Sequence, residues 1–178
     1  MRKLCFLMFA AALTSIIAGC KGPGADAVIF SQDKDTYCYI GDDEPQVVFA
    51  AFDMLSEDIS RVFGSRLLRA ESKRDADIIV ASARKLAGKW ETFSYKASRG
   101  RLTVQGSDAR GKAYGLLELS RMTGVSPWEW WADVTPQRRD SFRLSEVDMQ
   151  EQSPSVQYRG IFINDEDWGI NPWSTANY

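Results

Sequence analysis

Two segments carry apolar residues at helical spacing on one side only, and this pattern constrains the fold most. The first follows residues 42–45, three acids and a proline suited to a helix start, and Gly64 fits its end. The second starts after Ser107 or Asp108, which can cap a helix, and Gly124 fits its end. The faces consist of Val48, Phe52, Leu55, Ile59 and Val62 in the first segment, and Ala109, Ala113, Leu116, Leu117 and Ser120 in the second. Such helices need a second layer that covers their apolar sides.

Short strand-forming runs supply that second layer. Ile78-Ile79-Val80 predicts a strand buried on both faces. Arg99-Gly100 suits a tight hairpin turn between two alternating runs. The predicted strands cover 27–30, 36–40, 76–81, 93–97 and 102–104. The order β-β-α-β-β-β-α predicts an α+β fold, a small sheet with two helices packed on one face.

Two glycines of the second helix are separated by one helical turn. Gly111 and Gly115 are four residues apart, so they lie on the same side of the helix. Without side chains, they let the helix approach the sheet closely. A contact between two copies of the chain is the alternative.

The composition excludes several kinds of chemistry. The chain of 178 residues contains no histidine, which removes Ser-His-Asp and Cys-His catalysis and every metal site that needs histidine. The formal net charge of -2 gives no electrostatic reason to expect a nucleic-acid partner. The hydrophobic fraction of 44% suits a globular domain.

The N-terminal residues predict an export signal. Arg2 and Lys3 precede an apolar run, 4–17, that is too short for a comfortable membrane span, and small residues lead to Cys20. The ending resembles a bacterial lipobox, which implies cleavage after residue 19, a lipid on Cys20 and a tether over 20–27. We therefore expect an exported protein anchored to a bacterial membrane of the cell envelope, at the outer membrane or the cell surface. An ordinary signal peptide with a chance cysteine is the alternative. If residues 1–19 are removed and Cys20 carries a lipid, Cys38 is the remaining thiol of the mature chain. We expect Cys38 at a buried strand position.

A tryptophan-rich motif follows the second helix. Residues 126–134 contain Trp128, Trp130 and Trp131, and Pro127 disfavours continuation of the helix. Two interpretations remain open. The motif can form an aromatic plug between two domains, or it can form a surface on which a sugar ring stacks.

A second motif, 158–169, joins an apolar run to a group of polar side chains. Residues 158–163 predict a strand, and Asn164, Asp165, Glu166 and Trp168 follow its end. In (β/α)₈ barrels the functional groups lie at that end of a strand. Carboxylates there can transfer protons or bind sugar hydroxyls. Acidic residues are also common in turns, so a purely structural role is the alternative.

Together the motifs resemble glycoside hydrolase family 115, the xylan α-1,2-glucuronidases, in their N-terminal portion. The resembling segments are 106–115, 124–134, 153–156, 158–169 and Pro172-Trp173. The resemblance is weaker from about Ala27 but extends to the C-terminus. It implies an N-terminal α+β domain over 28–150, and a linker and the first strand of a truncated catalytic (β/α)₈ barrel over 151–178.

The family removes glucuronic acid or its 4-O-methyl ether from xylan side chains with inversion, and the resemblance implies no metal or organic cofactor. The substrate would be glucuronoxylan or its oligosaccharides. Asn164, Asp165, Glu166 and Trp168 become candidates for the rim of the active site, whereas the catalytic acid and base are not assigned. A barrel needs roughly 200 residues or more, so we expect the chain to be inactive alone. The stretch 82–90 is also shorter than is usual in the family. A stand-alone, lipid-anchored carbohydrate-binding or docking module is the alternative function.

Overall fold

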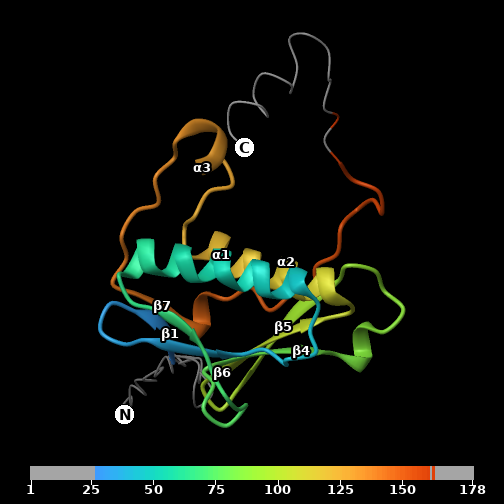
Figure 1. Ribbon diagram of the computed structural model, residues 1–178, viewed down its shortest axis with the longest axis horizontal. Helices are drawn as coiled ribbons and strands as arrows, with labels where there is room; N and C mark the ends of the chain where they lie inside the picture. The colour runs from blue at the N-terminus through green and yellow to red at the C-terminus, as the bar shows by residue number, and fades with distance from the viewer. Residues whose placement is uncertain (1–26, 161, 163–178) are drawn as a thin grey trace, which may run out of the picture.

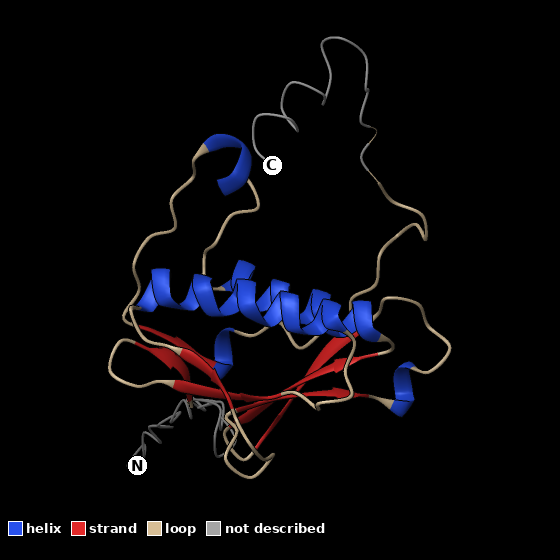
Figure 2. Ribbon diagram, in the orientation of Figure 1, coloured by secondary structure: helices blue, strands red, loops and turns tan. Residues whose placement is uncertain are grey.

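The computed structural model describes residues 27–160 and 162, except for the side chains of residues 130 and 131. Helices α1 (Gln46–Phe63) and α2 (Ala109–Met122) lie side by side on one face of the strands, as Figures 1 and 2 show. This arrangement confirms the predicted α+β class and the placement of both helices on one face. Among the described residues, no helix is long and apolar enough to cross a membrane. The predicted signal, Cys20 and all of the tether except its last residue fall outside the described residues.

The main sheet has five strands in the order β3-β2-β4-β6-β5. Its strands are β2 (Thr36–Tyr39), β3 (Leu67–Arg69), β4 (Ile78–Ser82), β5 (Phe93–Ser98) and β6 (Arg101–Gly106). All neighbours are parallel except β5 and β6, which form the predicted hairpin. At the turn, Arg99 and Gly100 have φ of 52° and 77°, the left-handed values that a two-residue turn of this hand requires.

Three strands depart from the prediction. The first predicted strand, β1 (Val28–Ser31), forms a separate antiparallel ribbon with β7 (Ser141–Arg143) instead of joining the main sheet. The prediction did not include β7 or the three-residue β3. Phe30 and Phe142 stack with ring centroids 6.0 Å apart, so the ribbon closes one side of the apolar core.

Helix α1 begins later than the acidic residues suggested. Pro45 is the residue before the first turn, and the first turn contains no acidic side chain. The acids at 42–44 therefore precede the helix, which corrects their predicted role in its start. Gly64 ends the helix as expected, with a left-handed φ of 77°.

Helix α2 begins as predicted. Asp108 accepts a hydrogen bond from the Gly111 amide at 2.7 Å, which caps the first turn. Added methyl groups at Gly111 and Gly115 would collide with Thr92 of the loop before β5 and Val104 of β6, respectively. Both glycines therefore serve close packing of the helix on the sheet, which confirms that interpretation.

The buried core lies between the helix pair and the strands. Cys38 of β2 is fully buried, as the sequence predicted. Burial raises the pKa of its thiol to about 12. The largest fully buried side chains include Phe30, Phe63, Phe142, Leu55, Ile59, Leu102 and Leu116. This core makes the helix pair and the strands one packed unit.

Candidate functional site

The candidate rim residues Asn164, Asp165, Glu166 and Trp168 lie outside the described residues. The structure describes only the approach to them. Residues 158–160 and 162 are not in a strand, and the side chains of Tyr158 and Phe162 are each 89% exposed. A barrel strand needs neighbouring strands to accept its hydrogen bonds, and the described residues offer this segment none. The strand predicted over 158–163 is therefore not confirmed.

The tryptophan-rich motif leaves the end of α2 and forms the one-turn helix α3 (Glu129–Ala132). Figure 1 places α3 beyond α1 and α2, on the side away from the sheet. An ion pair between Arg61 of α1 and Glu129 holds α3 to the helix pair. The Trp128 side chain is 64% exposed. An exposed indole face at this place is available for contact with another surface or a sugar ring.

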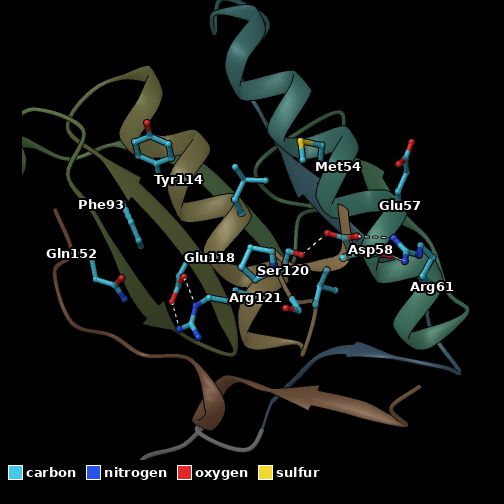
Figure 3. A pocket seen from close by; sticks show the side chains of 15 residues that line it. Met54, Glu57, Asp58, Arg61, Phe93, Tyr114, Glu118, Ser120, Arg121 and Gln152 are labelled. Carbon is cyan, nitrogen blue, oxygen red and sulfur yellow. Dashed lines mark hydrogen bonds and ion pairs between the residues drawn. The ribbon is translucent and has the colours of Figure 1, made fainter. Parts of the chain in front are cut away.

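An open groove of about 730 Å³ lies on the same side of the helix pair (Figure 3). Helix α1 contributes Met54 and Asp58, and helix α2 contributes Tyr114 and Arg121. Ser126 and Pro127, at the start of the tryptophan-rich motif, also line the groove. The groove thus joins both helices and the motif in one surface.

The charged side chains of the groove are largely engaged with one another. The Ser120 hydroxyl donates a hydrogen bond to Asp58, whose carboxylate also lies 3.6 Å from an Arg61 nitrogen. On α2, Glu118 accepts two hydrogen bonds from Arg121, one of them at 2.7 Å. Charge-assisted hydrogen bonds of this kind fix the carboxylates in place and occupy their acceptor positions. This groove therefore suits the binding of a surface better than acid–base chemistry.

A second polar cluster lies where the chain leaves the domain. Glu91 forms ion pairs with Arg110, at 2.9 Å, and with Arg159. Arg159 also donates a hydrogen bond to the Tyr114 hydroxyl at 3.0 Å, and its guanidinium lies 5.9 Å from the centre of the nearest Trp90 ring. We call these five residues the Glu91 cluster. The hydrogen bonds from Arg159 and then Arg110 lower the pKa of the Glu91 carboxyl.

Sequence reasoning missed both the groove and the Glu91 cluster. Glu91 and Arg159 are 68 positions apart, and no periodic pattern includes either residue. Arg159 stands inside the second motif, which was the one available signal. The groove depends on how the two helices pack side by side, which their separate apolar faces do not specify.

Comparison with known proteins identifies the class. A family model described as glycosyl hydrolase family 115 matches residues 151–178. A solved structure of a family 115 4-O-methyl-α-glucuronidase with specificity for decorated arabinogalactans is 41% identical, with a TM-score of 0.76. The match covers 84% of this chain and 21% of that chain. No curated protein matches.

Two more distant structures also align. A family 138 glycoside hydrolase that targets pectin rhamnogalacturonan II is 14% identical, with 61% of this chain and 15% of that chain covered and a TM-score of 0.41. A β-N-acetylhexosaminidase from Bacteroides fragilis is 15% identical, with 59% and 20% covered and a TM-score of 0.39.

The fold and the identity define a glycoside hydrolase domain of the α+β class. The chain belongs to glycoside hydrolase family 115 and corresponds to an N-terminal portion of such an enzyme. It spans 21% of the length of the 4-O-methyl-α-glucuronidase that it matches.

Proposed function

We propose that the chain is the N-terminal part of an exported, lipid-anchored enzyme that removes glucuronic acid or 4-O-methylglucuronic acid side chains from xylan. The observation that carries the proposal is the 41% identity to a 4-O-methyl-α-glucuronidase over 84% of this chain. That relative is specific for decorated arabinogalactans, so arabinogalactan is the competing substrate in the test below. The reaction is hydrolysis with inversion, which needs an acid and a base on opposite sides of the sugar.

The described domain would support the catalytic part and would not perform the chemistry. Its helix pair presents the groove, and Trp128 stands exposed beside it. In this proposal the tryptophan-rich motif is the aromatic plug between the two domains. The 178 residues alone would be inactive, because a barrel takes roughly 200 residues or more.

The experiment that tests the activity uses the enzyme that contains this chain followed by a family 115 catalytic part. It is incubated with glucuronoxylan and, separately, with an arabinogalactan that carries 4-O-methylglucuronic acid. Released uronic acid is measured by anion-exchange chromatography. Release from xylan supports the proposal, release from arabinogalactan alone corrects the polysaccharide, and release from neither refutes the glucuronidase assignment.

The proposed rim of the active site is tested by Asp165→Asn and Glu166→Gln. Side chains alternate along a strand, so consecutive positions start on opposite sides and the two acids should differ in importance. We expect a loss of activity of about tenfold to a hundredfold if the sensitive acid binds a sugar hydroxyl, and a larger loss if it transfers a proton. Full activity in both variants would show that the acidic run is structural.

Lipid anchoring is tested by Cys20→Ser in cells that process the export signal. The variant should leave the membrane fraction, because the acyl chains that hold the protein would be missing. If the wild-type protein is already soluble after export, the lipoprotein proposal is wrong.

One observation favours a second candidate function, a stand-alone carbohydrate-binding or docking module. The 64% exposure of Trp128 leaves an indole face open for stacking on a sugar ring. The 178-residue chain should then bind glucuronoxylan in affinity electrophoresis, and Trp128→Ala should abolish the retardation. Val134→Ala, a change at an exposed apolar residue beyond α3, is the control. Absence of binding by the wild-type chain would remove this candidate.

A further inference from the structure

The segment 151–159 leaves the domain along residues 89–93, which comprise the end of the loop before β5 and the first residue of that strand. Three contacts join them: Lys89 with Glu151, Phe93 with Gln152, and Glu91 with Arg159. The middle contact consists of two backbone hydrogen bonds of 2.9 Å each. The loop therefore fixes the direction in which the chain leaves the packed core.

Glu91 is the most buried of the charged side chains in these contacts. Its side chain is only 9% exposed, although it carries a charge and belongs to a loop. The residue also adopts a left-handed φ of 51°, which is unfavourable for a residue with a side chain. Its amide donates a hydrogen bond of 2.7 Å to Asp108, the residue that caps α2. Asp108 thus holds the backbone of Glu91 at the start of α2, where the Glu91 carboxylate also pairs with Arg110.

Arg159 is the side chain of the leaving segment that the Glu91 carboxylate binds. Its guanidinium contacts Glu91 and the Tyr114 hydroxyl, and it also lies against the rings of Trp90 and Tyr114. The same side chain donates a hydrogen bond of 2.6 Å to the backbone carbonyl of Val156. Arg159 therefore both shapes its own segment and fastens that segment to α2.

We infer that Glu91 is a positioning residue that fixes the segment 156–160 on the domain through Arg159. In the proposed enzyme this segment leads toward the catalytic part, so Glu91 would set how that part starts from the domain. The inference rests on the proposed function, because the catalytic part belongs to that proposal. The contact between Glu91 and Arg159 does not depend on the proposed function.

The first test uses the 178-residue chain and backbone ¹⁵N relaxation at residues 156–160. Glu91→Gln keeps the size of the side chain and removes the charge that Arg159 contacts. The order parameters of this segment should fall below about 0.6, the range of flexible backbone, whereas those of β4 and β6 should not change. Glu146→Gln is the matched control, because Glu146 also pairs with an arginine, Arg139, but within the domain. Unchanged order parameters at 156–160 in Glu91→Gln would overturn the inference.

The second test measures uronic acid release by the complete enzyme carrying Glu91→Gln, Arg159→Gln or both. Displacement of a reacting group by about 1 Å can cost about a hundredfold in rate. We expect kcat to fall about tenfold or more, KM to change little, and the double variant to match the single variants. Arg101→Gln is the control, since Arg101 contacts backbone carbonyls of the loop at 73–74 instead.

The outcomes distinguish a failure of the proposed function from a failure of the positioning role of Glu91. If the wild-type enzyme releases no uronic acid, the proposed function fails, and the relaxation measurement alone then decides whether Glu91 fixes the segment. If the enzyme is active and Glu91→Gln keeps its kcat, the positioning role is wrong. An equal loss in kcat for Arg101→Gln would also overturn it, because the loss would then reflect stability alone.

Discussion

Gly115→Ala should destabilise the domain, although alanine is the better helix former. The ideal methyl group at this position would lie 2.5 Å from Val104 Cγ1 and 3.5 Å from Phe93 Cδ2. Carbon atoms pack at about 3.5–4.0 Å, so the helix must rise from the sheet by about 1 Å or Val104 must leave its rotamer. Val104 is fully buried and β-branched, which makes its side chain stiff.

The opposing contributions can be compared. Replacing glycine in a helix interior favours alanine by about 1 kcal/mol. The rise would also stretch the 2.6 Å hydrogen bond from the Tyr95 hydroxyl to the Gly115 carbonyl, a loss of about 1 kcal/mol. These two effects cancel, and overpacking of about 1–3 kcal/mol remains. We expect a net loss near 2 kcal/mol, which lowers the Tm of a domain of this size by about 8 °C.

The assay is thermal and urea unfolding of the 178-residue chain, followed by far-UV circular dichroism. The double variant Gly115→Ala with Val104→Ala isolates the collision, because it removes the Val104 methyl group with which the new alanine side chain would collide. The two changes should be non-additive, with a favourable coupling of about 0.5–3 kcal/mol. A Tm at or above the wild-type value for Gly115→Ala, or simple additivity in the double variant, would refute the close-packing argument.

Three further outcomes are expected. Asp108→Ala should cost about 1 kcal/mol in urea unfolding through loss of the cap on α2. Cys38 should resist maleimide at pH 8 in the folded chain and react after unfolding, as read by peptide mass spectrometry, because burial raises its pKa to about 12. The lowered pKa of Glu91 means that its ion pairs stabilise the fold above the ordinary glutamate pKa and are lost as the pH falls through the lowered value. The backbone ¹⁵N order parameters at 156–160 should therefore decrease as the pH falls through that value, and Glu91→Gln should remove this pH dependence.

Local patterns were enough to predict the helices and the hairpin. The faces of α1 and α2, the end at Gly64 and the turn at Arg99-Gly100 each depend on residues that are close in sequence. Steric demands of single positions, such as the left-handed conformation at the turn, also act locally. Such features need no knowledge of the tertiary structure.

The strands that were missed depend on distant partners. Leu67–Arg69 and Ser141–Arg143 have three residues each, which is too short for a periodic signal. β7 forms a strand because β1 lies beside it, and the sequence between them does not encode that pairing. The same holds for Glu91, whose importance comes from Arg159 and not from its own neighbours in sequence.

The pairing of β1 with β7 has a consequence during synthesis of the chain. Among the described strands, β7 is the only one that pairs with β1, and it follows about 110 residues later. At about 5–20 residues per second, a ribosome needs roughly 6–22 seconds to reach it. Over that interval β1 and the Phe30 ring have no strand to close over them. A nascent chain halted before Ser141 should therefore remain a substrate for chaperones even after the main sheet has emerged.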